Sequence, residues 1–212
     1  MKLRTSLHEF VPPIIWRAFH ESTNAEQVLF DGDDGLFREL LDDAAIYGEY
    51  GVGLSTVVAY RESECAIQSV DTSQTWIEQV IEDCETRHDN ARMSIEWVDL
   101  GPLGDWGRPL TYAQMEDFGK YTGAIWRPQS TPDLILIDGR FRTACFFQAL
   151  LLSPPKTRIL FDDYVDRPHY HVVERVLSPT TSYGRQALFV VPDAVDSTEI
   201  RRLYEQFLMV LD

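Results

Sequence analysis

The stretch that most constrains the fold runs from Ala44 to Thr56, where a short apolar run meets two glycines and continues into a helix-like segment. Gly51 and Gly53 carry no Cβ, so the chain can turn sharply there and a ligand can approach the backbone closely. A strand that ends in a glycine turn and leads into a helix directs backbone N–H groups at a ligand. The sequence therefore predicts an α/β fold in which this turn borders a binding site.

Three kinds of ligand are compatible with such a turn: a phosphate, a dinucleotide and adenosylmethionine. A phosphate-binding loop needs a lysine directly after its glycines, and no lysine follows Gly53 until Lys120. The dinucleotide fingerprint needs a third glycine where Thr56 stands, because the helix must pack close to the pyrophosphate. The pattern that remains is acid-x-Gly-x-Gly-x-Ser, from Glu49 to Ser55. Since a glycine turn after a strand is also common as plain structural punctuation, the pattern needs support from elsewhere in the chain.

From residue 44 onward, the sequence alternates strand-like and helix-like segments, which favours a mostly parallel sheet covered by helices on both faces. Two of the strands, 133–138 and 157–163, are continuous apolar runs closed by acids, as expected of buried central strands. The other predicted strands are 44–50, 65–70, 93–100 and a terminal hairpin at 182–185 and 186–191; the predicted helices are 54–63, 73–87, 111–121, 144–152, 168–177 and 196–211.

Two further segments stand apart from this alternation. Residues 1–43 are predicted to form a helical prelude or cap, with one short helix after Pro12-Pro13 and another over 34–43. Residues 44–212 then form the main domain, in which 101–132 is an insertion-like loop rich in aromatic residues. Long loops within compact domains are often functional, so we expect this one to lie over a substrate site.

The composition limits the partners and the compartment. Thirty-four acidic residues against 19 basic ones give a net charge of −15, which disfavours nucleic acid and anionic membranes and leaves a small molecule as the expected partner. The basic residues that stand out are Arg140, Arg142, Arg158 and Arg167. Three cysteines without metal-site spacing, no leader-like apolar segment and no apolar run of about 20 residues predict a cytoplasmic protein, and a homodimer is compatible with the sequence.

Acidic residues close four of the predicted parallel strands: Glu49, Asp71, Asp138 and the pair Asp162-Asp163. In open α/β sheets, ligands bind beyond the carboxyl ends of the strands. Asp71 lies 20 residues after Gly51, the spacing at which an acid on the second strand binds ribose hydroxyls. Each acid alone is equally compatible with capping the following helix. Together with the glycine turn, the four positions favour a nucleoside site.

These motifs resemble a known family. The segment Glu49 to Ser55, Asp71, the run 133–139 and Phe161-Asp162-Asp163-Tyr164 follow the order and separations typical of class I adenosylmethionine-dependent methyltransferases. Over residues 44–191, the chain is most similar to the small-molecule O-methyltransferase branch. The resemblance implies a Rossmann-like three-layer sandwich with a seven-stranded, mostly parallel sheet and one antiparallel strand. It also implies S-adenosyl-L-methionine as cofactor and methyl transfer to an oxygen of a small acceptor.

The same resemblance implies roles for particular residues. Glu49 would lie near the methionine end of the cofactor, Asp71 would hold the ribose, and Asp99 would lie by the adenine. The complete set of expected cofactor contacts is Glu49, Tyr50, Gly51, Gly53, Ser55, Asp71, Thr72, Asp99 and Asp138.

The resemblance also raises the question of a metal. In metal-dependent members of the branch, an acid after the fourth strand and two polar residues after the fifth hold Mg²⁺, and Asp138, Asp162 and Asp163 occupy those positions. Such a cation lowers the pKa of an acceptor hydroxyl, which is otherwise a poor nucleophile. Adjacent residues of a strand point to opposite faces, so the two neighbouring acids can share an ion only if the chain turns there.

The expected catalytic residues are Asp138, Asp162 and His169. No lysine follows Asp138 as a base, so His169 is included because histidine titrates near neutral pH. Two alternatives stay open: a nucleoside-binding module of the same fold without catalysis, and a nicotinamide-dependent oxidoreductase, which Thr56 disfavours.

Overall fold

The structure is a computed structural model that describes residues 29–85 and 91–212. The helix expected after Pro12-Pro13 lies outside the described residues. The strands are β1 (Ile46–Tyr50), β2 (Ala66–Asp71), β3 (Met93–Trp97), β4 (Leu134–Ile137), β5 (Arg158–Phe161), β6 (Thr181–Tyr183) and β7 (Gln186–Val190). The α-helices are α2 (Gly35–Asp42), α3 (Leu54–Glu62), α4 (Gln74–Asp83), α5 (Phe118–Gly123), α6 (Arg142–Leu152) and α7 (Ser197–Phe207), and the 3₁₀ helices are η1 (Phe30–Gly32), η2 (Asp105–Gly107), η3 (Met115–Asp117) and η4 (Pro168–Arg175).

The seven strands form one sheet in the order β3-β2-β1-β4-β5-β7-β6. The pairs from β3 to β5 are parallel, and β7 runs antiparallel to both β5 and β6. The predicted mostly parallel sheet with a reversed strand in a terminal hairpin is therefore confirmed. The chain winds outward from β1 in one direction and from β4 in the other, so the strand order reverses between them, where ligands of such sheets bind.

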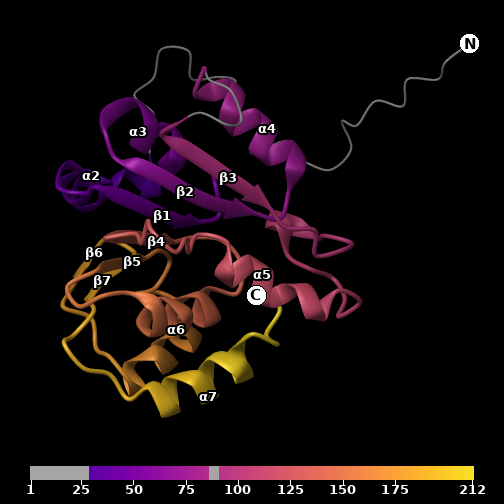
Figure 1. Ribbon diagram of the computed structural model, residues 1–212, viewed down its shortest axis with the longest axis vertical. Helices are drawn as coiled ribbons and strands as arrows, with labels where there is room; N and C mark the ends of the chain where they lie inside the picture. The colour runs from indigo at the N-terminus through magenta and orange to yellow at the C-terminus, as the bar shows by residue number, and fades with distance from the viewer. Residues whose placement is uncertain (1–28, 86–90) are drawn as a thin grey trace, which may run out of the picture.

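Helices cover both faces of this sheet (Figure 1). Helices α2, α3 and α4 lie on one face, and α5, α6 and α7 lie on the other. Within β4, Leu134 and Leu136 join the core under the first group, whereas Ile135 and Ile137 join the core under the second. The unbroken apolar run in the sequence follows from this burial on both faces.

Three elements differ from their predictions in ways that bear on the site. Strand β3 ends at Trp97 rather than near residue 100, and residues 168–175 form a 3₁₀ helix that starts at Pro168. The helix expected over 111–121 begins later, at η3 and α5, because the Thr111 hydroxyl accepts a hydrogen bond from the Ala113 N–H and closes a turn.

The described part of the N-terminal prelude packs on the sheet. Phe37, Leu40 and Leu41 of α2 are buried in the same core as β1, and the Phe37 ring lies 5.7 Å from the ring of Tyr47. Helix α2 therefore closes one face of the sheet. No helix of the described residues is long and apolar enough to cross a membrane.

Candidate functional site

Two glycine turns meet at the reversal of strand order. Gly51, directly after β1, has φ of 88°, a conformation that side chains rarely tolerate. A Cβ on Gly51 would lie 2.5 Å from the Cα of Gly139, and a Cβ on Gly139 would lie 2.6 Å from the backbone nitrogen of Gly51. Glycine is therefore required at both positions, because the turns after β1 and β4 touch through their backbones.

Glu49 lies beneath the first turn and is fully buried. Its carboxylate accepts hydrogen bonds from four hydroxyl groups, those of Tyr47, Ser55, Thr56 and Ser69. Burial raises the pKa of Glu49 to about 7, although the hydroxyl donors act in the opposite direction. Glu49 and Ser55, both expected at the cofactor, are thus buried and bonded to each other, and they stabilise the glycine turn.

Thr56 stands where a dinucleotide site would have its third glycine. Its hydroxyl donates to Glu49 at 2.6 Å and accepts from the N–H of Gly53 at 3.0 Å. The first turn of α3 is therefore tied to β1 by side-chain hydrogen bonds.

Asp71 joins the glycine turn to the end of β2. Its two carboxylate oxygens accept from the N–H of Val52 at 3.1 Å and the N–H of Ser73 at 2.8 Å. Burial raises its pKa to about 6, and the backbone donors oppose this shift. Each oxygen keeps a further lone pair, so a carboxylate fixed in this way fits two neighbouring ribose hydroxyls. Thr72, the next residue, donates from its hydroxyl to the carbonyl of Gly107 at 2.9 Å and so connects β2 to the long loop.

Trp97 is a site residue that the sequence analysis missed. It pairs with Asp71 in the sheet register, its side chain is 45% exposed, and its indole N–H donates to the carbonyl of Thr72 at 3.0 Å. Asp99 lies two residues beyond the end of β3 and is exposed, and its carboxylate accepts from the N–H of Gly101 at 2.9 Å. The role of Asp99 beside the adenine stays a prediction, and the tryptophan that ends β3 is a further candidate for the same part of the site.

Most aromatic residues of the segment 101–132 belong to the core. Phe118 and Tyr121 are fully buried, and the indole N–H of Trp126 donates to the hydroxyl of Tyr50 at 2.9 Å. Tyr50 itself is fully buried and donates to the carbonyl of Thr122, so its side chain packs away from the turn that it precedes. The other two aromatic residues of the segment, Trp106 and Tyr112, are exposed, at 70% and 52% of their surface.

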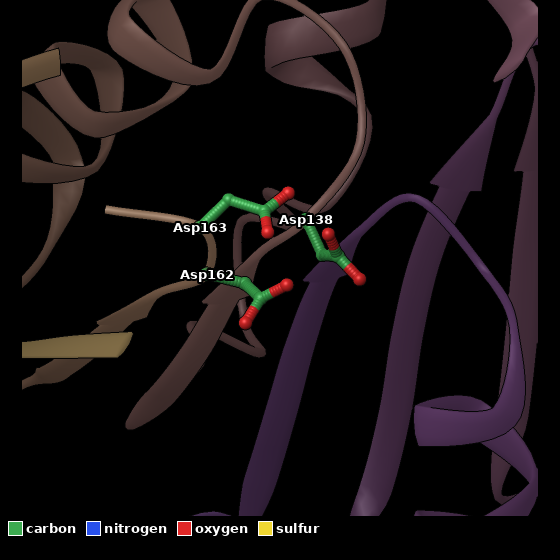
Figure 2. Close-up of side chains that lie close together, drawn as sticks. All are labelled: Asp138, Asp162 and Asp163. Carbon is green, nitrogen blue, oxygen red and sulfur yellow. The ribbon is translucent and has the colours of Figure 1, made fainter. Parts of the chain in front are cut away.

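The three predicted carboxylates after β4 and β5 converge (Figure 2). Strand β5 ends at Phe161, and Asp163 has φ of 57°, so the chain turns where the prediction required a turn. One oxygen each of Asp138, Asp162 and Asp163 lie within 4.8 Å of one another. Arginine side chains contact all three carboxylates.

The three carboxylates differ in accessibility. The Asp162 side chain is fully buried, whereas that of Asp138 is 30% exposed and pairs with Arg142 through Oδ1 at 2.9 Å. Burial raises the pKa of Asp138 to about 8, and the charge of Arg142 opposes this shift. Asp138 is thus the member of the cluster best placed to meet an acceptor.

His169 lies on η4 and is exposed, with its ring 4.2 Å from the ring of Tyr170. Tyr170 in turn lies 5.9 Å from the guanidinium of Arg142. Tyr170 therefore lies between His169 and the arginine that pairs with the carboxylates.

Arg140 is a second residue whose position the sequence did not reveal. Its N–H donates to the hydroxyl of Tyr121 at 3.0 Å, which fixes the turn after β4. Burial raises the pKa of Asp71 and that of Asp212, and the positive charge of Arg140 opposes both shifts, so the half-buried guanidinium lies in the field of both carboxylates. This cation at the strand-order reversal suits a ligand that carries a carboxylate.

Comparison with known proteins gives the same fold. A crystal structure of a methyltransferase-like protein from Silicibacter pomeroyi is 29% identical, with a TM-score of 0.73 over 86% of this chain and 97% of that one. A methyltransferase from Geobacter sulfurreducens is 13% identical, with a TM-score of 0.51 over 88% of this chain and 93% of that one, and shares the fold alone. No protein-family model and no curated protein matches the sequence. The chain thus has the class I methyltransferase fold, and its resemblance to the adenosylmethionine-dependent methyltransferases is confirmed.

Proposed function

We propose that the protein transfers a methyl group from S-adenosylmethionine to an oxygen of a small acceptor. The observation that carries this proposal is the position of Asp71, whose carboxylate is fixed by the N–H of Val52 in the glycine turn. An acid held between this turn and the end of β2 is suited to bind ribose hydroxyls, and it lies one strand away from the point where the strand order reverses between β1 and β4.

The surrounding residues suit the other parts of such a cofactor. The half-exposed indole of Trp97 offers an apolar face for adenine next to Asp71. The guanidinium of Arg140 supplies a positive charge for the methionine carboxylate. Gly51 is partly exposed and carries no Cβ, so a ligand can approach its backbone closely.

When bound, the cofactor supplies an electrophilic methyl group on its sulfonium. The protein's own contribution is to hold an acceptor oxygen in line, about 3 Å from the methyl carbon, because alignment accounts for much of the rate of such displacements. Asp138 is the carboxylate placed to receive the acceptor's proton, since its side chain is partly exposed at the end of β4. Asp162 is fully buried, and its role is to position Arg185 through their ion pair. His169, which is exposed, is the second candidate for the general base.

The expected setting follows from the same features. A net charge of −15 supports a small-molecule acceptor over nucleic acid. Cys65, Cys84 and Cys145 are free and buried, which suits a reducing compartment such as the cytoplasm. Residues 44–212 would carry the reaction, with α2 as a cover of the sheet.

Calorimetry with adenosylhomocysteine, adenosylmethionine and NAD tests the cofactor assignment. We expect both adenosyl compounds to bind and NAD to give no heat, and NAD binding without a response to adenosylhomocysteine would overturn the assignment.

Mass spectrometry after incubation with paired hydroxyl and amine acceptors then tests the reaction. Methylation of the hydroxyl compounds, reduced about 100-fold or more in Asp138→Asn, is expected if Asp138 acts as the base. Binding without any methylation would instead identify a nucleoside-binding module, and methylation of amines alone would refute the oxygen acceptor.

A further inference from the structure

The carboxylate cluster at the ends of β4 and β5 has the composition of a divalent-metal site, yet its partners are arginines. Asp138, Asp162 and Asp163 each direct an oxygen toward a shared space (Figure 2). Hard oxygen ligands of this kind suit Mg²⁺ or Ca²⁺ only if their lone pairs are available to the ion.

Arg142, the first residue of α6, fills much of the space between the two strand ends. It is only 4% exposed, and every nitrogen of its guanidinium has a partner. Nε donates to the carbonyl of Gly139 at 3.1 Å, Nη1 to the carbonyl of Asp162 at 2.9 Å and to Asp163 at 3.1 Å, and Nη2 to the carbonyl and the carboxylate of Asp138 at 2.8 and 2.9 Å. Only the planar, five-donor guanidinium can join two strand ends in this way.

Arg185, in the turn between β6 and β7, pairs with the fully buried Asp162. Its Nε and Nη2 donate to the two oxygens of Asp162 at 3.0 and 2.7 Å in a fork-to-fork pair. Its Nη1 donates to Asp31, just before α2, at 2.8 Å. Arg185 therefore connects the end of β5 to the terminal hairpin and to the N-terminal segment.

Every carboxylate of the cluster already has a cationic partner. Arg167 adds a third cation by pairing with Asp163 at 2.7 Å, so three guanidinium groups face three carboxylates. A divalent ion would have to displace these bonds and then lie close to three positive charges, at a large electrostatic cost. The residues present therefore do not fit a resident divalent metal.

We propose that Arg142 and Arg185 form a guanidinium clamp that takes the place of the divalent cation and makes the site metal-independent. The clamp fixes the ends of β4 and β5, and with them Asp138, by side chains of the protein itself. It does not depend on the proposed methyl transfer, because the interactions act on the folded structure whatever the reaction.

Melting temperatures with MgCl₂ or CaCl₂ alone test the clamp. We expect no shift in the wild-type protein, since a ligand stabilises a protein only when the folded state binds it preferentially. We expect Arg185→Met to melt several degrees lower, because the buried Asp162 carboxylate loses both of its hydrogen bonds to Arg185, and added Ca²⁺ to recover part of that loss. A rise in the wild-type melting temperature that Asp138→Asn abolishes would overturn the clamp, as would an unchanged melting temperature in Arg185→Met.

Two further variants keep the test interpretable. Arg202→Met, which removes a surface pair with Glu199 on α7, should leave the Ca²⁺ response equal to that of the wild type. The double variant Asp162→Asn/Arg185→Met removes both charges and should fold without gaining a Ca²⁺ response. If Arg185→Met fails to fold, Arg167→Met at the 45% exposed Arg167 side chain removes one cation from Asp163 and should give a weaker Ca²⁺ response, because Arg142 still pairs with Asp163. An ion response in the double variant equal to that of Arg185→Met would place the ion elsewhere and refute the assignment.

Discussion

At the scale of single residues, the acids at the strand ends perform different tasks despite their similar positions in the sequence. Glu49 is buried beneath the glycine turn and accepts from four hydroxyl groups, whereas each carboxylate oxygen of Asp71 accepts from one backbone N–H group. The first therefore bears on stability and the second on ligand binding.

The pH dependence of stability should report on Glu49. Its pKa of about 7 in the folded protein exceeds its ordinary value of 4.5, so the folded state binds the proton more tightly than the unfolded state. Stability should thus fall as the pH rises from about 4.5 to about 7, by roughly 3 kcal/mol for this group. Urea unfolding at pH 5 and pH 8 should show this loss in the wild type and a smaller one in Glu49→Gln. The exposed Glu78→Gln serves as control, and an identical pH dependence in both variants would contradict the assignment.

Substitution of Asp71 should weaken cofactor binding. Asp71→Ala removes the carboxylate that we assign to the ribose, and a loss of at least about 1 kcal/mol in adenosylhomocysteine binding is expected by calorimetry. Asp193→Ala is the control, because Asp193 is an exposed acid beyond the end of β7 and is not among the expected cofactor contacts. Equal affinity of the two variants would show that Asp71 only caps α4.

At the scale of elements, the site depends on how closely the turns after β1 and β4 approach each other. Gly51 and Gly139 contact each other through their backbones, which positions Asp138 and Arg140 beside the first turn. The helices that follow these turns start from fixed points for that reason.

Alanine at this contact should therefore be destabilising. A Cβ on Gly139 would meet the backbone of Gly51 at 2.6 Å, a separation that real Cβ atoms essentially never show. Gly139→Ala should lower the free energy of unfolding by more than about 1 kcal/mol, as overpacking does, and should weaken adenosylhomocysteine binding. Gly123→Ala in α5 is the control, since nothing lies within 4 Å of its added Cβ and helix propensity favours alanine. Gly139→Ala with wild-type stability would refute the close contact.

The loop between β3 and β4 contains both exposed and core-packed aromatic residues, and alanine substitutions should distinguish the two groups. Trp106 is 70% exposed, so Trp106→Ala should leave the melting temperature unchanged but reduce acceptor turnover more than cofactor binding. Trp126→Ala should lower the melting temperature, because its indole packs on the core and bonds to Tyr50. Comparable thermal losses in both variants would assign Trp106 to the core as well.

At the scale of the whole molecule, one sheet separates two apolar cores. The proposed ligand lies at the carboxyl ends of the parallel strands, whose side chains pack into both cores. A ligand bound there contacts the ends of β1, β2 and β4 together, so binding should stabilise the fold as a unit.

Adenosylhomocysteine should therefore raise the melting temperature. At about 100 times its dissociation constant, a ligand adds about 2.7 kcal/mol, which corresponds to roughly 5–10 °C for a protein of this size. NAD should give no shift, because Thr56 replaces the glycine that a dinucleotide needs and binds Glu49 instead. A shift with NAD alone, measured by differential scanning fluorimetry, would contradict the cofactor proposal.

The sequence alone determined the sheet and the places where chemistry gathers. Apolar runs closed by acids mark strands that are buried on both faces, so β4 and β5 were predicted together with their acidic ends, and the reversed β7 was predicted from the terminal hairpin. The sequence placed Asp138 and the pair Asp162-Asp163 at one edge of the sheet, but the convergence of all three depended on the turn at Asp163, which only the structure shows.

Only the tertiary structure decided which groups those acids face. The partners of Asp162 are Arg185, 23 residues later, and through it Asp31, and no local pattern couples residues that distant. The contact between Gly51 and Gly139 and the exposure of Trp97 likewise depend on strand register and on where β3 stops. Periodicity specifies which face of an element is buried, but pairing between distant side chains is fixed by packing, and packing here placed guanidinium groups where the sequence had indicated a metal.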